Sequence, residues 1–244
     1  MNLVIDIGNT RTKIAIFESG EIIFNSIIDE FSMNEIEAIF QRYPNLKNGI
    51  ISSVKDYPGE IKKFIQNSIN NFIELDHTTN IPLVNKYKTP ETLGKDRLAA
   101  TVGANQLFPN QNLLVIDAGT AITFDFVSER NEYLGGNISP GIEIRFKALH
   151  QFTGKLPLIN QKEEFEEIGT NTESAIRAGI QLGVLFEIEQ YIDHFNKLYQ
   201  NLQIIITGGD SYFFDKKLKK TIFVDFNLNL LGLNRILEYN VEET

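Results

Sequence analysis

The chain has 244 residues and a formal net charge of −9, with 42% apolar and 23% charged residues. This composition is typical of a globular protein with one large domain or two smaller ones. The negative charge opposes non-specific binding to nucleic acid, where affinity comes largely from neutralising phosphates. The absence of cysteine excludes disulfides, zinc–thiolate sites and cysteine nucleophiles, and it fits a cytoplasmic protein.

Membrane association is not expected either. No apolar run approaches the roughly 20 residues that a membrane-spanning helix needs. The first residues enter a strand-like pattern and reach Asp6 at once, which does not match a secretory signal.

The first half of the chain begins with a conspicuous hairpin pattern. An apolar run at residues 3–7 contains Asp6, turns at Gly8 and resumes at 14–17, which predicts two antiparallel strands joined by a tight turn. The expected elements that follow are a strand at 21–28, a helix after the capping box Ser32–Glu35, a strand at 49–54, a helix with its apolar face at 61–69, and a strand at 72–75.

The same hairpin construction returns in the second half, where Asp117 and Gly119 take the places of Asp6 and Gly8. The stretch 151–171 reads as a long loop with a helical piece. The remaining expected elements are strands at 113–117, 120–127 and 132–137, helices at 142–150 and 173–199, a strand at 203–207 that ends at Gly208-Gly209-Asp210, a lysine-rich helix, a strand at 222–224 and a C-terminal helix.

One such turn on its own is most simply an ordinary hairpin with turn-favouring residues. Two copies in register indicate duplicated architecture instead. We therefore expect an α/β fold with two domains, 1–108 and 109–244, a linking helix near 96–108, and a central cleft. Glycine turns with exposed N–H groups bind phosphate oxygens, and a carboxylate positions hydrated Mg²⁺, so two facing turns suit a nucleotide.

Several motifs carry a family resemblance. Asp6–Thr10, Asp117–Thr123 and Gly208–Asp210 resemble the phosphate and adenosine motifs of the acetate-kinase, sugar-kinase, Hsp70 and actin superfamily. Within that superfamily, four further stretches resemble type III pantothenate kinase: Tyr87–Pro90, Leu93–Arg97, Pro140–His150 and Thr153–Pro157. The motifs follow one another in unbroken order from residue 3 to about 210. The resemblance implies two duplicated ribonuclease H-like (actin-like ATPase) domains.

The resemblance also implies an activity. The family transfers the γ-phosphoryl group of ATP to the primary hydroxyl of pantothenate, giving 4′-phosphopantothenate in the first step of coenzyme A biosynthesis. It uses Mg²⁺ together with a monovalent cation, K⁺ or NH₄⁺, and works as a cytoplasmic homodimer. ATP and pantothenate are then the partners, with neither nucleic acid nor a membrane involved.

Residue roles follow from the same resemblance. Asp96 is the expected catalytic base. Asp6 is expected to hold Mg²⁺ through water, and Asp117 the monovalent cation. The residues expected to bind ATP are Asp6, Ile7, Gly8, Asn9, Thr10, Arg11, Thr12, Lys13 and Thr120. The residues expected to bind the substrate are Tyr87, Gly94, Lys95, Asp96, Arg97 and Thr172.

The residues of the substrate group also suit structural roles. A carboxylate within hydrogen-bond reach of an alcohol can take its proton, but Asp96 also suits a helix N-terminus, where it would interact with the helix dipole. Arg97 suits a substrate carboxylate or carbonyl, or else a surface ion pair. Tyr87 suits an interface aromatic, and Thr172 suits a helix cap in competition with Asn171.

The pair Gly208-Gly209 suits close approach of the nucleotide, and it equally suits a strand-to-helix turn with Asp210 as the cap of the helix. Both roles can hold at the same time.

Some features are expected to be structural. His77, His150 and His194 show no metal-binding spacing, and the lysines at 216–220 and the acids at 163–167 read as solvated faces. Two further functions stay open, namely another small-molecule kinase on this scaffold and a non-catalytic nucleotide-binding protein. The loop from Tyr87 to Arg97 favours the pantothenate family over the first. The presence of Asp96, Asp6 and Asp117 together argues against the second.

Overall fold

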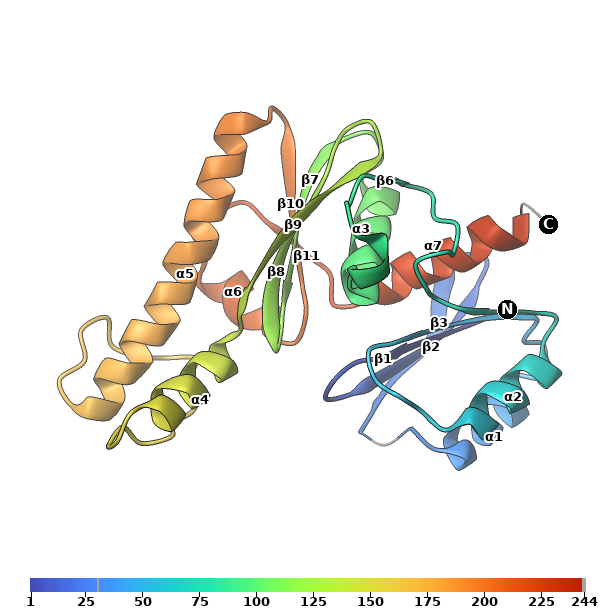
Figure 1. Ribbon diagram of the computed structural model, residues 1–244, viewed down its shortest axis with the longest axis horizontal. Coiled ribbons are helices and arrows are strands. Elements are labelled where there is room, and N and C mark those ends of the chain that lie inside the picture. The colour runs from blue at the N-terminus through green and yellow to red at the C-terminus, as the bar shows by residue number, and fades with distance from the viewer. Residues whose placement is uncertain (30, 243–244) are drawn as a thin grey trace. The chain divides into compact units, whose positions relative to one another are not determined.

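The computed structural model describes residues 1–29 and 31–242. The chain is α/β and forms two compact units (Figure 1). The first unit contains Met1–Pro109, Asn131–Tyr133 and Asn227–Thr244, and the second contains Asn110–Arg130 and Leu134–Phe226. No helix in the described part of the chain is long and apolar enough to cross a membrane.

The sheet of the first unit has the strand order β3-β2-β1-β4-β5. β1 runs antiparallel to β2 and parallel to β4, so the initial hairpin is extended on its other side by two parallel strands. The strands are β1 (Asn2–Ile7), β2 (Thr12–Glu18), β3 (Glu21–Ile28), β4 (Asn48–Ser53) and β5 (Asn71–Glu74). All five predicted strands of this half are confirmed.

Helices cover both faces of this sheet (Figure 1). α1 (Met33–Arg42) and α2 (Gly59–Ser68) pack their isoleucines against Leu3, Ile5 and Ile7 of β1. Because side chains alternate along a strand, Asn2 and Asp6 point to the opposite face. There Asn2 hydrogen-bonds Asn234 of α7 (Leu228–Glu242), with 2.9 Å from Nδ2 to Oδ1.

The C-terminal helix α7 belongs to the first unit, although the sequence pattern placed it in a domain at 109–244. It packs against α3 (Lys95–Leu107), the predicted linking helix, in a contact between glycines. A Cβ on Gly232 would overlap the Ala99 carbonyl of α3, and a Cβ on Gly103 would overlap the Leu228 carbonyl of α7. This close packing against α3 makes the C-terminal helix α7 part of the first unit.

The sheet of the second unit has the strand order β11-β10-β7-β8-β9. The short strand β6 extends it by pairing with Glu132 and Tyr133 at the start of β9. Both β6 and these two residues belong to the first unit. β7 and β8 form the second hairpin, and β10 and β11 run parallel to β7. The strands are β6 (Val84–Asn85), β7 (Asn112–Ala118), β8 (Ala121–Val127), β9 (Glu132–Pro140), β10 (Leu202–Thr207) and β11 (Phe223–Val224).

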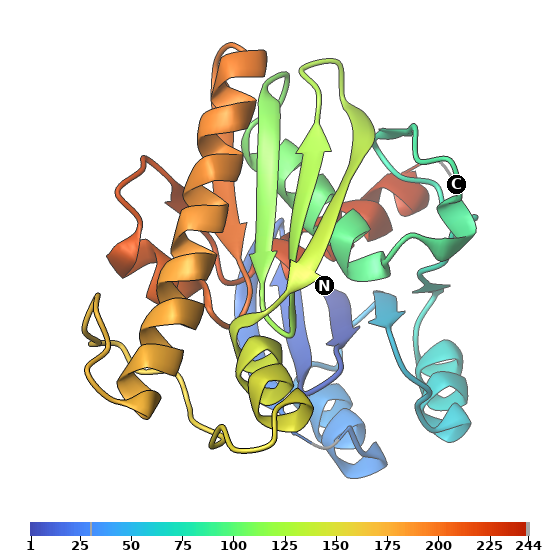
Figure 2. The same cartoon turned by 60° about the vertical axis from the view of Figure 1, so that its left-hand side comes forward.

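One face of this sheet packs against three helices, and α5 runs along the strands (Figure 2). They are α4 (Ile142–Phe152), α5 (Thr172–Leu198) and α6 (Ser211–Lys217). Their apolar side chains form one core with Leu114 and Ile116 of β7 and Phe124 of β8. The predicted long helix is confirmed, and the predicted lysine-rich helix is present but ends at Lys217, so Lys219 and Lys220 lie beyond it.

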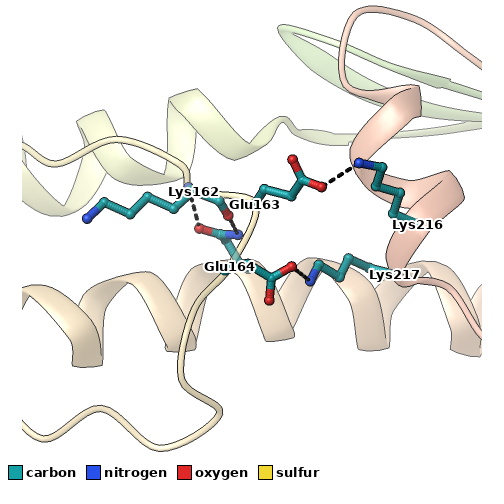
Figure 3. Close-up of polar contacts among 6 residues, drawn as sticks. Lys162, Glu163, Glu164, Lys216 and Lys217 are labelled. Carbon is teal, nitrogen blue, oxygen red and sulfur yellow. Dashed lines mark hydrogen bonds and ion pairs between the residues drawn. The ribbon is translucent and has the colours of Figure 1, made fainter.

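One local prediction was wrong, and two short elements were not predicted. The segment 153–171 contains no helical turn in the structure, and the short elements β6 and η1 (Pro90–Thr92) were not predicted. The acids of the run 163–167 are exposed, as predicted for a solvated face, and two of them also meet the lysines of α6 (Figure 3). Glu163 pairs with Lys216 at 2.5 Å, and Glu164 with Lys217 at 2.9 Å. The segment is therefore a loop that lies against α6.

Candidate functional site

The first glycine turn lies at the carboxyl end of β1. Gly8 N–H donates to the Arg11 carbonyl at 3.1 Å, which closes a four-residue turn. Asn9, Thr10 and Arg11 are exposed on this turn, whereas Ile7 and Thr12 are buried in the strands that flank it. The predicted ATP-binding segment is therefore an exposed turn on a rigid pair of strands.

Asp6 is buried just before this turn, with 9% of its surface exposed. Lys13 of β2 lies opposite it on one side and Ser52 of β4 on the other. The Ser52 hydroxyl is buried and has no hydrogen-bond partner among the described residues. A buried hydroxyl that lacks a hydrogen-bond partner next to a carboxylate indicates a site for an ion or an ordered water molecule. Mg²⁺ prefers oxygen ligands of this kind. These residues thus fit a hydrated Mg²⁺.

The second glycine turn, in the second unit, is shorter. Gly119 N–H donates to the Ala121 carbonyl at 3.0 Å, so only Gly119 and Thr120 separate the two strands. The Thr120 carbonyl accepts from Gly141 N–H at 3.0 Å, which brings the start of α4 against the turn. Thr120 itself is exposed.

Asp117 stands at the same place relative to its turn as Asp6 does. Its strand neighbours are Thr123 on β8 and Thr207 on β10. The Thr123 hydroxyl is again buried without a hydrogen-bond partner among the residues described. Gly208, at φ +95°, lies so close that a Cβ would overlap the Asp117 carboxylate and the Ala118 carbonyl. The Asp117 carboxylate, the Thr123 hydroxyl and nearby main-chain carbonyls are oxygen ligands of the kind that a hard monovalent cation prefers.

Asp210 follows the glycine pair and holds the N-cap position of α6, but its side chain makes no capping hydrogen bond. Its main-chain N–H donates instead to the Ala118 carbonyl at 2.9 Å. Burial raises the pKa of Asp210 to about 6, and the negative charge of Glu143 on α4 acts in the same direction. The predicted capping role is not borne out, and the carboxyl group titrates near neutrality.

The loop from Tyr87 to Arg97, which we call the acceptor loop, leads into α3. Asp96 is the second residue of that helix and is half-buried. Its Oδ1 accepts a hydrogen bond from Arg97 N–H at 2.8 Å. A Cβ on Gly94 would lie 2.5 Å from the same oxygen, so the carboxylate occupies the space that a side chain would take. The helix N-terminus and the glycine together fix this carboxylate.

Arg97 is not on the surface, since only 4% of it is exposed. Its guanidinium carbon lies 5.6 Å from the centre of the Tyr87 ring, within the range of a cation–π contact. The Tyr87 ring lies in turn 6.1 Å from that of Tyr133. The structure thus brings Tyr87, Gly94, Asp96 and Arg97 together in the first unit, and Arg97 does not lie at the surface.

Two residues predicted to bind the substrate do not join the group of Tyr87, Gly94, Asp96 and Arg97. Lys95 lines a separate small cavity with residues that follow β5. Thr172 is the exposed first residue of α5 in the second unit. Asn171 is the cap of that helix, because its Oδ1 accepts from Ser174 N–H at 3.0 Å.

The sequence reasoning missed Ser52 and Thr123, although a signal was available. Each is a small polar residue in an otherwise apolar strand, and each faces a carboxylate once strand register is known. No group of three or more histidine or acidic side chains suited to a metal occurs in residues 1–29 and 31–242. Any cation at these turns therefore depends on single carboxylates with hydroxyl and main-chain oxygens.

Comparison with known proteins decides the family. A family model described as type III pantothenate kinase matches residues 2–194. A Phocaeicola vulgatus protein named type III pantothenate kinase is 50% identical over 240 residues, covering 98% of this chain and 99% of the relative. The chain belongs to the type III pantothenate kinase family. As a type III pantothenate kinase family member it is an enzyme of the kinase class.

Solved structures agree with this family on the fold. An activator of 2-hydroxyisocaproyl-CoA dehydratase from Clostridium difficile, with bound ADPNP, superposes with a TM-score of 0.57 at 12% identity, covering 99% of this chain and 96% of that one. A glucokinase from an Antarctic psychrotroph gives 0.53 at 13% identity, covering 98% of each chain. The predicted fold of ribonuclease H-like, actin-like ATPase domains is confirmed for this kinase family member.

Proposed function

We propose that this protein transfers the γ-phosphoryl group of ATP to the primary hydroxyl of pantothenate, giving 4′-phosphopantothenate for coenzyme A biosynthesis. Family membership supports the substrate pair. The observation that carries the chemistry is the Asp96 carboxylate, held over Gly94 at the start of α3 beside the buried Arg97. Phosphoryl transfer needs positioning and charge neutralisation more than covalent work by the protein.

Asp96 acts as the general base in this proposal. The acceptor alcohol is a weak nucleophile, and a carboxylate within hydrogen-bond reach takes its proton as the new P–O bond forms. The bond from the γ-phosphorus to the bridging oxygen breaks, and ADP leaves with that electron pair. Arg97 and Tyr87 orient the acceptor, the arginine through a planar guanidinium suited to carboxylate or carbonyl oxygen.

We propose that ATP phosphates bind at the glycine turns. Main-chain N–H groups of the exposed turn residues 9–11 and of Thr120 hold phosphate oxygens. Asp6 with Ser52 holds hydrated Mg²⁺, and Asp117 with Thr123 holds K⁺ or NH₄⁺. Neutralisation of charge on the phosphate oxygens is the chemistry that these cations would supply when bound. Homodimer formation, a substrate contact from Thr172 and a cytoplasmic location complete the proposal.

Coupled measurement of ADP release tests the proposed function. Purified protein with Mg-ATP is assayed with and without pantothenate, first in K⁺ buffer and then in Na⁺ buffer. We expect ADP release only with pantothenate, and much faster in K⁺. ATP hydrolysis that is independent of pantothenate would support a nucleotide-binding protein that is not a pantothenate kinase. Equal rates in both buffers would remove the monovalent cation from the proposal.

A further inference from the structure

Lys55 is a cationic residue at the first glycine turn that the sequence analysis did not single out. It is exposed on the loop that follows β4, and its Nζ lies 3.5 Å from the Asn9 main-chain carbonyl oxygen. Asn9 is one of the exposed residues of the turn at which we propose that ATP phosphates bind. The lysine and the turn belong to the same unit. The ammonium group therefore lies beside a proposed phosphate site.

The main chain around Lys55 is fixed to the end of β1. Val54 N–H donates to the Ile7 carbonyl at 3.1 Å, which attaches the residue before the lysine to the strand that leads into the turn. The Ser53 hydroxyl donates to the Lys55 carbonyl and accepts from Lys55 N–H at 3.3 Å. Only the flexible four-carbon stem of the lysine is left to move, so its ammonium stays within reach of the turn.

The Asn9 carbonyl is a neutral partner for this charge. Asp56 follows Lys55 in the sequence, but no acid in the described part of the chain forms an ion pair with the lysine. A phosphate oxygen carries the negative charge that a carbonyl oxygen lacks, and hydrogen bonds between two charged groups are among the strongest. A phosphate group at the turn would therefore compete successfully with Asn9 for the ammonium.

The other two cations near this turn already face acids. Arg11 Nε lies 3.9 Å from Asp29 Oδ1, and Lys13 lies opposite Asp6 across the hairpin. The chain as a whole carries a net charge of −9, which repels an anionic ligand. Lys55 thus supplies positive charge at the place where a bound triphosphate needs it.

We propose that Lys55 is a further ATP-binding residue, whose ammonium moves from the Asn9 carbonyl to a phosphate oxygen of ATP at the first glycine turn. Lysine suits this role because it carries a compact charge with three hydrogen-bond donors. Lys55 makes no contact with pantothenate in this proposal, so its effect is on nucleotide affinity. The inference depends on the proposed function, since it assumes that ATP phosphates bind at this turn.

Calorimetric titration of the full chain with the Mg²⁺ complex of the non-hydrolysable ATP analogue AMPPNP tests the proposal. We expect Lys55→Met to raise the Kd about tenfold, the order expected for loss of a hydrogen bond between charged groups. Lys55→Arg, which keeps the charge, is expected to stay within about threefold of wild type. The control is Lys47→Met, which removes an exposed lysine just before the other end of β4 and should leave the Kd unchanged.

Ionic strength separates a phosphate contact from a structural role in the turn. The effect of Lys55→Met is expected in about 0.05 M KCl and should largely disappear in about 1 M KCl, because salt screens exposed charges. A tenfold loss that is the same at both concentrations would show that Lys55 acts by shaping the turn through Asn9. That result would overturn the phosphate contact.

Two further results would contradict the proposal: equal Kd values for wild type and Lys55→Met, or an equal loss in Lys47→Met. Melting temperatures identify a variant that has lost its fold, in which case Lys55→Gln replaces Lys55→Met. In steady-state kinetics the KM for pantothenate at saturating ATP should change less than about twofold in Lys55→Met, and a larger rise would indicate a contact with pantothenate instead. A wild-type protein that binds AMPPNP through Lys55 but does not phosphorylate pantothenate would overturn the proposed function alone.

Discussion

At the scale of single residues, the position of the Asp96 carboxylate depends on the absence of a side chain at Gly94. A Cβ on Gly94 would lie 2.5 Å from Asp96 Oδ1. We predict that Gly94→Ala displaces the carboxylate and lowers kcat by roughly 10²-fold, the order expected for a misplaced catalytic group. Steady-state kinetics measures this. The matched control is Gly59→Ala on α2, where an added Cβ meets nothing within 4 Å, and equal kcat in both variants would contradict the geometry.

Asp210 gives a prediction about pH. Burial, helped by the charge of Glu143, raises its pKa from 3.8 to about 6 in the folded protein. Between these values the folded state binds a proton that the unfolded state has released, so this group's contribution to stability falls as pH rises from about 4 to 6. We predict that Asp210→Asn gains stability relative to wild type as pH rises through that window, and that the difference is constant above pH 7. Urea unfolding at pH 4.5, 5.5 and 7.5 measures it, and a difference that is the same at every pH would contradict the assignment.

At the scale of elements, the loop at 153–171 is held by one buried amide. Gln181 of α5 is fully buried, accepts from Lys162 N–H at 3.1 Å and donates to the Lys162 carbonyl at 2.7 Å. The ion pairs of Glu163 and Glu164 are exposed and so contribute little. The amide is therefore the main polar anchor of this loop.

We predict that Gln181→Met costs about 1–3 kcal/mol in free energy of unfolding, because it leaves the Lys162 main-chain groups without their partners. Tryptic cleavage after Lys155 and Lys162 should also become faster. Urea unfolding and limited proteolysis measure the two effects. Gln190→Met, at an exposed position of the same helix, is the control. Identical cleavage rates in the two variants would rule out the anchor.

The α3–α7 contact is the second element-scale feature, because the helices touch through glycine. We predict that Gly232→Ala destabilises the protein by about 1–3 kcal/mol, as overpacking does, since the new Cβ overlaps the Ala99 carbonyl. Gly183→Ala on α5 meets no atom within 4 Å and should be neutral or stabilising. Thermal unfolding of both variants measures this, and similar melting temperatures would contradict the close packing.

At the scale of the whole molecule, hydropathy and turn chemistry predicted the elements well. The apolar runs of β1 and β2, the capping box at Ser32 and the apolar face of α5 each follow from local pattern. The start of α3 was also predictable, and with it the place of Asp96 in a helical first turn. Local pattern decides these features because each depends on neighbours along the chain.

The features that sequence missed depend on contacts between distant residues. Ser52 and Thr123 gain their meaning only from strand register with Asp6 and Asp117. The membership of α7 in the first unit depends on the Gly103–Gly232 approach, which no periodicity reveals. Lys95 was predicted as a substrate contact. Its place in the wall of a small cavity depends on how the residues that follow β5 pack against the acceptor loop.

The central claim is that this chain phosphorylates pantothenate with Asp96 as the base, and direct measurement of product tests it. Wild type and Asp96→Asn are incubated with Mg-ATP and pantothenate in K⁺ buffer, and 4′-phosphopantothenate and ADP are quantified by mass spectrometry, with circular dichroism to verify the fold. We predict equal amounts of the two products from wild type, and a kcat roughly 10²–10⁴-fold lower for the folded Asp96→Asn variant. A folded Asp96→Asn variant that forms 4′-phosphopantothenate at the wild-type rate would contradict the account.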